Sequence, residues 1–305
     1  MHHVNEAAVA AWRANANVGV EGRADIRAIV GVGVRVHTNI KVRAGVCVAL
    51  LACASAAFAQ SSAPAPAAPA RAPTGAPACK GTVYLTIDTG SMSQAQLIAD
   101  TLGKHQVKAT FFLANEKTIN GDYSLDDAWA PLWKRLVADG HKFGSHTFDH
   151  VYFRGGDVAG AAVRAKPQFG AQAGRSQTWN QQQFCAELDR VKTRFTQLTG
   201  SSLAPLWRAP GGFTTPNTLR WAKACGYAHT GWSPAGFLGD ELPSHSHPNQ
   251  QLLARASKHI KDGDVLMMHT GIWSRKDAFA PMLDPLITAL TAKQLCFATV
   301  GDAGY

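Results

Sequence analysis

The sequence predicts an α/β fold, a distorted (β/α)7–8 barrel, for residues 79–305. Three observations predict it. From residue 82 onward, short apolar segments rich in Val, Leu, Ile and Phe alternate with longer amphipathic segments, which is typical of parallel strands joined by helices. About seven such units occur, enough to curl the sheet into a closed or nearly closed barrel. Polar residues also follow several apolar segments, and the carboxyl ends of barrel strands are where catalytic residues gather.

The first half of this domain supplies three predicted strands and three predicted helices. The strands are short apolar runs at 82–88 (TVYLTID), 108–114 (KATFFLA) and 141–146 (HKFGSH). The helices have apolar residues at helical spacing and cover 93–105, 126–140 and 180–200. Asn180 is the expected cap of the last helix, and Gly200 is expected to end it. Residues 151–178 show neither period, and we expect a long irregular region there.

The second half repeats the alternation without an evident internal repeat. Its predicted strands are 203–210 (LAPLWRAP), 227–232 (YAHTGW), 264–269 (DVLMMH) and 295–300 (LCFATV). Its predicted helices are 215–226, 249–263 and 281–294. Trp129, Trp133 and Trp221 lie at helical spacing and are expected in the core.

The first 59 residues predict export. Basic residues at Lys41 and Arg43 precede an apolar run that ends in the small residues of "AFA", residues 57–59, as in a secretory signal peptide. Residues 1–40 form an unusually long preface to such a signal, which favours a translation start further along. The segment "LLAC" offers an alternative, a lipoprotein site with Cys53 as the lipidated residue. Both readings place the mature protein outside the cytoplasm, secreted or periplasmic.

Residues 60–78 are rich in Ala and Pro and predict an extended, semi-rigid linker to the folded domain. The whole chain carries a formal net charge of +9, but from position 60 on it has 24 basic and 18 acidic residues. This mild bias comes without a basic run or interleaved aromatic residues, so no nucleic-acid partner is expected. The apolar run of the leader is too short for a stable membrane span.

Four cysteines lie beyond the leader: Cys79, Cys185, Cys225 and Cys296. None has the CxxC spacing of a zinc site, and an oxidising compartment makes disulfides plausible. Cys79 precedes the first strand and Cys296 lies in the last, so they are expected to pair and to leave the other two as a second pair. Free buried thiols are the alternative.

The segment "GSHTFDH" carries the strongest single chemical signal. His146 and His150 stand four residues apart directly after a predicted strand, and two imidazoles so placed can converge on one divalent cation. The same spacing also occurs on ordinary surfaces, so the pair alone does not decide between a metal site and a solvated loop.

Four motifs in order settle the interpretation: "LTIDTG", "SHTFDH", "WRAPGG" and "DVLMMHTG". Together they resemble the polysaccharide deacetylases of the NodB type, carbohydrate esterase family 4, over roughly residues 82–300. The resemblance implies removal of N-acetyl groups from a glycan that contains N-acetylglucosamine, with a divalent metal, Zn²⁺ or alternatively Co²⁺ or Ni²⁺. It also implies a role for each matching residue: Asp88 as general base, His146 and His150 as metal ligands, Arg208 as the partner of the base, Pro210 and Gly211 in a turn, and His269 as general acid.

Thr89 departs from the family pattern, which has a second, metal-binding aspartate at this place. A neutral hydroxyl is a weak ligand, so three outcomes are open. The metal is held by the two histidines with water or Thr89, Asp88 enters the coordination sphere, or the site is empty and inert. We expect a metal that is bound more weakly, with Asp88 in or beside its first shell. A backbone N–H of Thr89 or Gly90 is expected to assist the substrate oxyanion.

The segment "GWSPAGFLGDELPSHSH" matches the family only in part. Trp232 is the expected wall of the acetyl pocket, and Asp240 is the expected partner of the acid histidine. His245 and His247 are alternative metal ligands, although a solvated loop is favoured. Trp273 is a candidate for stacking on a sugar ring.

The sequence therefore predicts a metal-dependent polysaccharide N-deacetylase. Two other functions stay open. One is a non-catalytic envelope protein that binds polysaccharide in the same groove, which metal content would distinguish. The other is a deacylase of a small amide, which a series of substrate lengths would distinguish.

Overall fold

The computed structural model describes residues 79–155 and 161–301. The predicted signal peptide, the linker and Cys53 lie outside these residues. Seven parallel strands form the main sheet: β1 (Gly81–Asp88), β2 (Thr110–Leu113), β3 (Lys142–Ser145), β7 (Leu206–Trp207), β8 (Ala228–His229), β9 (Val265–His269) and β10 (Leu295–Ala298). Each matches a predicted strand. None of the helices in the described ranges is long and apolar enough to cross a membrane.

The sheet runs in the order β10-β1-β2-β3-β7-β8, and β9 also pairs with β1. It curls into a half-barrel in which β8 and β9 are not paired with each other. The chain between them passes along β9, where Phe237 forms an isolated parallel bridge with Met267. The α/β barrel prediction is confirmed, and its distortion follows from the two-residue length of β7 and β8.

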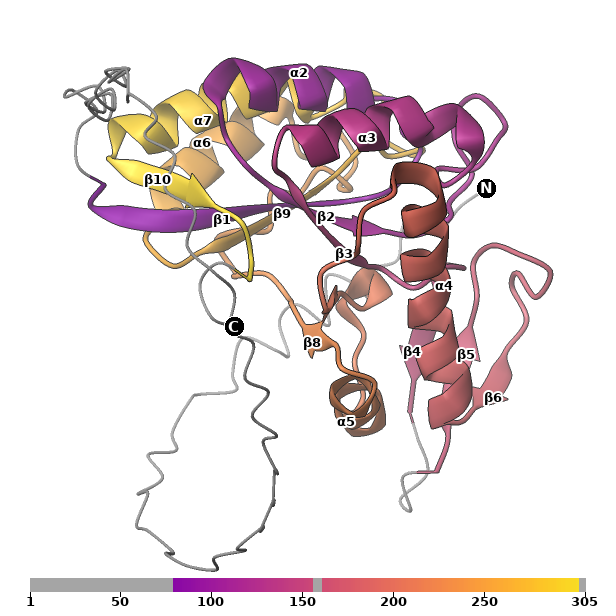
Figure 1. The fold of residues 1–305 in the computed structure, drawn as a ribbon. Coiled ribbons are helices and arrows are strands. Elements are labelled where there is room, and N and C mark those ends of the chain that lie inside the picture. The colour runs from indigo at the N-terminus through magenta and orange to yellow at the C-terminus, as the bar shows by residue number, and fades with distance from the viewer. Residues whose placement is uncertain (1–78, 156–160, 302–305) are drawn as a thin grey trace, which may run out of the picture. The chain divides into compact units, whose positions relative to one another are not determined.

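Helices follow the strands as the alternating pattern predicts. They are α2 (Ala95–His105), α3 (Ala130–Ala138), α4 (Gln181–Thr199), α5 (Pro216–Ala224), α6 (Asn249–His259) and α7 (Leu283–Ala292). Short 3₁₀ turns lie at Asp127–Trp129, Pro210–Gly212 and Ala280–Met282. Helices α2, α3, α6 and α7 lie together over one face of the sheet (Figure 1). Their apolar faces and strand β1 build the main core, which includes the predicted core residue Trp133, while Trp221 is buried in a second cluster.

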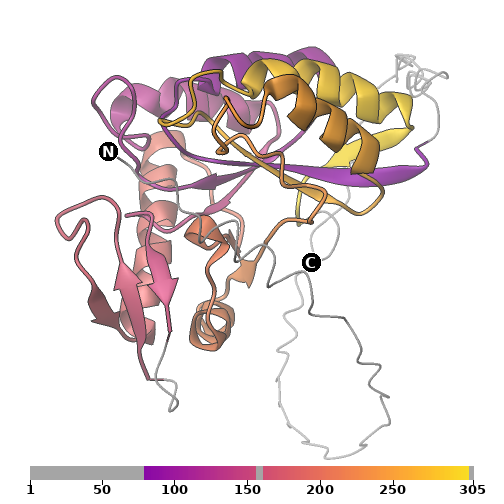
Figure 2. The same ribbon diagram turned by 180° about the vertical axis from the view of Figure 1, so that it is seen from behind.

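The prediction of an irregular segment over 151–178 is wrong in part, because only residues 167–176 of its described portion form a long connection without helix or strand. The segment forms an antiparallel sheet of β4 (Tyr152–Arg154) and β5 (Val163–Lys166), completed by β6 (Gln177–Trp179). Residues in β5 alternate between buried and exposed positions, the period of a half-buried strand, but over four residues this pattern is too short to recognise. The small sheet lies beside α4 in the view from behind (Figure 2), and its buried side chains share a cluster with that helix.

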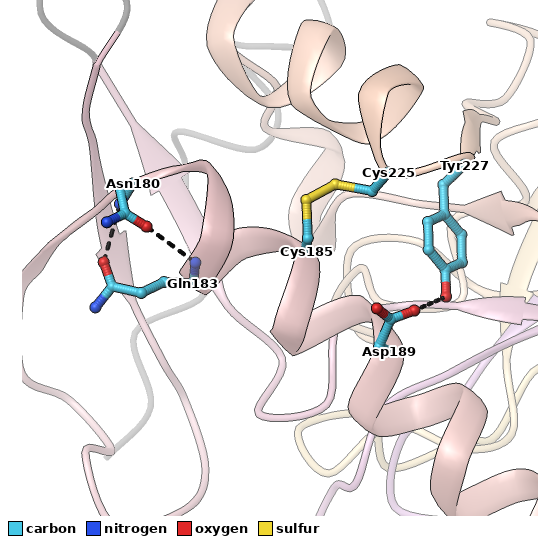
Figure 3. The surroundings of a disulfide bond; sticks show 6 residues. All are labelled: Asn180, Gln183, Cys185, Asp189, Cys225 and Tyr227. Atoms are coloured by element: carbon cyan, nitrogen blue, oxygen red, sulfur yellow. Dashed lines mark hydrogen bonds between the residues drawn. A yellow bond between two sulfur atoms is a disulfide. The ribbon is translucent and has the colours of Figure 1, made fainter.

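Two disulfides join the chain as predicted. Cys79 pairs with Cys296, which ties the start of the described domain to its last strand. Cys185 on α4 pairs with Cys225 at the end of α5 (Figure 3).

Helix α4 begins and ends as the sequence predicts. The Asn180 side chain accepts from the Gln183 backbone N–H and the Gln183 side chain accepts from the Asn180 N–H, a capping box that is visible in Figure 3. The left-handed Gly200 terminates the helix. Asp189, further along α4, accepts a hydrogen bond from the Tyr227 hydroxyl. This bond and the Cys185–Cys225 disulfide join α4 to the α5–β8 segment.

Candidate active site

Four polar side chains lie at the carboxyl ends of neighbouring strands: Asp88 on β1, His146 after β3, Arg208 after β7 and His269 on β9. Asp88 is aligned with His269 in the β1–β9 pair. Ser145 is aligned with Trp207 in the β3–β7 pair, so the residues that follow them are neighbours too. Parallel strands thus bring all four groups to one edge of the sheet, although they are far apart in sequence.

Asp88 is held by Arg208 in a buried ion pair. Arg208 Nη1 donates to Asp88 Oδ1 at 2.8 Å, and both side chains are almost completely buried. The other two guanidinium nitrogens donate to the carbonyl oxygens of Thr230 at 3.1 Å and Gly231 at 2.9 Å. Burial alone would raise the pKa of Asp88, but the Arg208 charge together with smaller contributions from His146 and His269 outweighs it and holds that pKa below its usual range. Asp88 is therefore an oriented carboxylate at neutral pH.

His146 faces the second oxygen of the same carboxylate. Its Nδ1 lies 3.0 Å from the Arg208 carbonyl oxygen, which makes Nδ1 the protonated donor nitrogen. Its Nε2 is left as the basic nitrogen and lies 3.7 Å from Asp88 Oδ2. Burial lowers the pKa of His146 to about 3, so the ring is neutral. A neutral imidazole fixed through its other nitrogen is the form that binds metals.

His150 stands beside His146, with the two ring centroids 5.0 Å apart. Its Nδ1 is buried and has no hydrogen-bond partner among the described residues. The loop between the histidines is tightly constrained, because Thr147 and His150 have left-handed backbones with φ of 60° and 48°. Thr147 Oγ1 accepts the Val151 N–H at 2.7 Å, which stabilises this turn. The fold thus holds a buried imidazole nitrogen that is free to bind a ligand.

The Thr89 hydroxyl is already engaged in two hydrogen bonds. The hydroxyl donates to Glu116 Oε1 at 2.7 Å and accepts the Ala114 N–H at 2.9 Å. Glu116 lies in the loop after β2 and is 9% exposed. Sequence reasoning missed Glu116, since no motif includes it. Its only sequence signal is an acidic residue three positions beyond a strand end.

His269 is paired with Asp240. Asp240 Oδ1 lies 3.1 Å from His269 Nδ1, and Asp240 Oδ2 accepts the His269 backbone N–H at 2.7 Å. The opposite nitrogen, Nε2, lies 3.9 Å from a carboxylate oxygen of Glu241. Burial alone would lower the pKa of His269, but the negative charges of Asp240 and Glu241 outweigh it and raise that pKa to about 10. The ring is therefore a protonated donor at neutral pH.

A sequence model of the polysaccharide deacetylase family matches residues 75–230. The chain belongs to the polysaccharide deacetylase family. Its relatives include the peptidoglycan-N-acetylmuramic acid deacetylase PdaA of Bacillus subtilis, 27% identical over 222 residues, which cover 72% of this chain and 70% of the relative. A peptidoglycan-N-acetylglucosamine deacetylase of Bacillus cereus is 22% identical over 222 residues, covering 72% of this chain and 86% of that protein. The family resemblance of the four motifs is confirmed.

Solved structures show the same fold as this member of the polysaccharide deacetylase family. A family 4 carbohydrate esterase from Streptomyces lividans, in complex with acetate, matches with a TM-score of 0.53 at 19% identity and covers 74% of this chain and 96% of its own. A family 4 pseudoenzyme from Bacillus anthracis also matches at 0.53 and 18% identity, covering 73% and 65% of the two chains. A mutant of that pseudoenzyme is described as having restored enzymatic activity. The fold is thus shared by active and inactive proteins.

The side chains at this site include ligands of the types that bind divalent cations. His146 offers a neutral Nε2, His150 has an unpartnered nitrogen, and Asp88 Oδ2 lies within reach of the first ring. Thr89 contributes no charge where the family pattern has an aspartate. Within residues 79–155 and 161–301, no three His, Cys, Asp or Glu side chains are already grouped to hold a metal ion. The two imidazoles are in place, and the arrangement lacks a converged third ligand.

The residues predicted to contact the substrate include Gly90, Pro210, Gly211 and Trp232. A Cβ added to Gly90 would lie 2.2 Å from the Gly271 carbonyl oxygen, so only glycine fits where the β1 and β9 loops meet. Pro210 and Gly211 form a 3₁₀ turn after Arg208, with Gly211 in the left-handed region at φ of 61°. Trp232 lies with its ring 5.6 Å from the Arg208 guanidinium carbon. These positions stay predictions as substrate contacts.

Trp273 is 58% exposed and belongs to the loop after β9. That loop also borders a cavity of about 170 Å³ beside His269 and Asp240. His245 is exposed, and His247 Nδ1 lies 3.1 Å from the Ser246 hydroxyl. Across the described ranges, no ring contact or hydrogen bond joins either histidine to the imidazole pair, which favours the solvated loop over the substitute ligands.

The pairing of His269 with Asp240 predicts the alkaline limit of activity. If His269 donates a proton, turnover should persist above neutral pH and fall as the pH rises through a pKa of about 10, where the ring becomes neutral. Asp240→Asn removes the charge that raises the pKa of His269 most, so the alkaline limb of the pH–rate profile should move to lower pH by about one unit or more. A pH–rate profile of the two proteins checks this. An unshifted alkaline limb would mean that another group sets it.

Proposed function

We propose that this chain is an exported, metal-dependent hydrolase that removes N-acetyl groups from a glycan containing N-acetylglucosamine or a related N-acetylated sugar. One observation carries the proposal: Asp88 is a buried carboxylate kept ionised by Arg208, with a neutral imidazole on one side and a protonated one on the next strand. An acetamide is a poor electrophile, and these groups match what its hydrolysis requires.

Asp88 is the general base. Its Oδ1 is occupied by Arg208, so Oδ2, on the side of His146, is the oxygen that accepts a proton from water. A divalent cation held by His146 and His150, with Asp88 in or beside its coordination sphere, would supply a more acidic water and would polarise the acetyl carbonyl. Zn²⁺ suits imidazole and carboxylate ligands, with Co²⁺ or Ni²⁺ as replacements.

His269 is the general acid. Asp240 holds its Nδ1, which leaves Nε2 as the nitrogen that donates to the leaving amine. The fixed pair both orients the ring and keeps it protonated until the carbon–nitrogen bond breaks. The water oxygen forms the new bond to the acetyl carbon while Asp88 accepts one of its protons, and the carbon–nitrogen bond breaks as His269 Nε2 protonates the sugar nitrogen. Loss of the proton from Asp88 and reprotonation of His269 then complete the cycle, with acetate and the free amine as products.

The backbone at Gly90 is placed to assist the oxyanion. The Thr89 N–H is already used, because it donates to the Phe112 carbonyl at 3.0 Å. The Gly90 N–H makes no hydrogen bond within the described part of the chain, so this donor is available to a substrate oxygen. One such donor contributes about 3 kcal/mol to the stability of the transition state.

The substrate class rests on the relatives, whose names describe peptidoglycan deacetylases. The predicted leader and linker support an extracytoplasmic location, where such glycans occur. Trp273, exposed beside the His269 loop, is the proposed stacking surface for a sugar ring. Trp232 is the proposed wall of the acetyl pocket.

Thr89 favours one rival, a polysaccharide-binding protein without catalysis. Its hydroxyl is committed to Glu116 and Ala114, and an inactive protein occurs among the structural neighbours. Metal content separates the two functions. A purified protein that binds an N-acetylated glycan but takes up no divalent metal supports the rival.

Acetate release tests the proposed function. The protein is stripped with a chelator, then assayed on N-acetylglucosamine oligomers and on peptidoglycan fragments with and without added Zn²⁺ or Co²⁺. We expect no release after stripping and restored release with metal. A series of oligomer lengths distinguishes a polymer deacetylase from a deacylase of small amides. Absence of release with every metal and every substrate would contradict the proposal.

A further inference from the structure

Glu116 differs from every other buried carboxylate in the described residues. Those carboxylates are Asp88, Glu116, Glu187, Asp240 and Asp264. The other four each have a basic side chain within 4.0 Å, and these partners are Arg208, Arg190, His269 and Lys261, respectively. Glu116 has no such partner in the described ranges. Its carboxylate bonds instead to the neutral hydroxyl of Thr89.

An unpaired buried carboxylate is costly. A single hydroxyl donor replaces only part of the hydration that the ionised group loses, so a cation is the usual compensation. No Lys, Arg or His of the described chain supplies it. The second carboxylate oxygen, Oε2, accepts no hydrogen bond from these residues. Glu116 therefore has no basic partner in this part of the protein.

The backbone places this charge beside the imidazole pair. The Asn115 N–H donates to the Phe148 carbonyl at 2.7 Å, which joins the Glu116 loop to the turn between the two histidines. Glu116 Oε1 also accepts from Thr89, and Thr89 follows Asp88, whose Oδ2 lies 3.7 Å from His146 Nε2. Within the described residues, a carboxylate without a basic partner and a buried imidazole nitrogen without a hydrogen-bond partner thus lie in one neighbourhood.

We propose that Glu116 supplies the anionic metal ligand that Thr89 cannot, so that the divalent cation is held by His146, His150 and Glu116. The inference rests on the proposed function, because it assigns a ligand to the same metal. It explains how the chain tolerates a threonine where the family has a metal-binding aspartate. The carboxylate ligand comes instead from Glu116, a longer side chain in the loop after β2, and the Thr89 hydroxyl orients that carboxylate. Asp88 is then free to act as base.

Binding of the cation by Glu116 requires only the Glu116 side chain to move. The Glu116 backbone is fixed by the Ser124 hydroxyl, which accepts its N–H at 3.1 Å, and by the Ser124 N–H, which donates to its carbonyl at 2.8 Å. Glutamate has three side-chain torsions, so its carboxylate can present Oε2 to a cation while Oε1 keeps the Thr89 hydrogen bond and these anchors stay in place.

Metal affinity of the full chain tests the proposal independently of activity. Zn²⁺ binding is measured by calorimetry after chelation, and Co²⁺ binding by visible absorption, for the wild type and for Glu116→Gln. The substitution keeps the shape and still accepts the Thr89 hydroxyl. We expect the Zn²⁺ dissociation constant to rise about tenfold or more and the Co²⁺ spectrum to change. Asp122→Asn, in the same loop, is the matched control and should leave both unchanged.

Thermal unfolding separates a ligand from a structural group. In chelator, Glu116→Gln should have a Tm equal to or above that of the wild type, because an unpaired buried charge is removed. In excess Zn²⁺ the order should reverse, because the wild type gains more from binding. A purely structural Glu116 would lower the Tm equally in both conditions, which would overturn the proposal.

A second variant restores the ligand from the family position. Thr89→Asp placed in the Glu116→Gln background should recover Zn²⁺ affinity. If Glu116→Gln binds Zn²⁺ as tightly as the wild type while His146→Ala loses it, the Glu116 proposal fails and the proposed function stands. If the wild type itself takes up no Zn²⁺ or Co²⁺, both fail.

Discussion

Replacing Asp88 with asparagine is expected to lower the rate of acetate release by about 10²–10⁴-fold, the usual contribution of a general base. The amide of Asp88→Asn would keep an oxygen that accepts from Arg208, so the side chain stays in place. It cannot take a proton from water, because an amide is not a base at accessible pH. The loss should therefore appear in kcat and not in the binding of a glycan oligomer.

The control for this variant is Asp264→Asn. Asp264 is also a buried carboxylate, but it lies at the opposite end of β9 and pairs with Lys261. Both variants are compared by circular dichroism and thermal unfolding at the assay pH. Asp264→Asn should remain active if it folds. An Asp88→Asn protein that is folded and still turns over near the wild-type rate would remove Asp88 from the base role.

The sequence reveals the active-site cluster because of how parallel strands are built. Asp88 and His269 each end an apolar run, and the carboxyl ends of parallel strands share one edge of a sheet. Reading the ends of the runs thus predicts that these side chains gather at one edge, whereas the pairing of Arg208 with Asp88 was predicted from the family resemblance. The first disulfide was predictable for a related reason, since Cys79 precedes the first strand and Cys296 lies in the last, and these two strands pair side by side.

The parts that the sequence did not reveal depend on contacts that leave no periodic pattern. The strands β4, β5 and β6 have three or four residues each, at most two repeats of a strand pattern. Glu116 stands out only because it is buried without a basic partner in the described part of the chain, and burial cannot be read from the sequence. The pairing of Asp240 with His269 was inferred from the family, because 29 residues separate them and no local signal joins them.

Arg208→Met is expected to reduce the free energy of unfolding by about 3–5 kcal/mol, the cost of leaving one member of a buried ion pair without its partner. Arg208 is fully buried, and its loss would strand the Asp88 carboxylate together with two backbone carbonyls. The pKa of Asp88 should then rise, because burial would no longer be opposed by the guanidinium. Urea unfolding measures the stability loss, and the acid limb of the pH–rate profile should move to higher pH.

The double variant Asp88→Asn with Arg208→Met decides whether the ion pair itself causes the loss. Neutralising Asp88 removes the uncompensated charge, so the double variant should be more stable than Arg208→Met alone, by a coupling of about 1–3 kcal/mol. Arg208→Lys keeps the charge but not the planar set of donors that reaches Asp88, Thr230 and Gly231 together. It should therefore fall between the wild type and Arg208→Met in stability. If the two single losses simply add, the buried pair is not coupled, and Arg208 stabilises the barrel through the carbonyls of Thr230 and Gly231 instead.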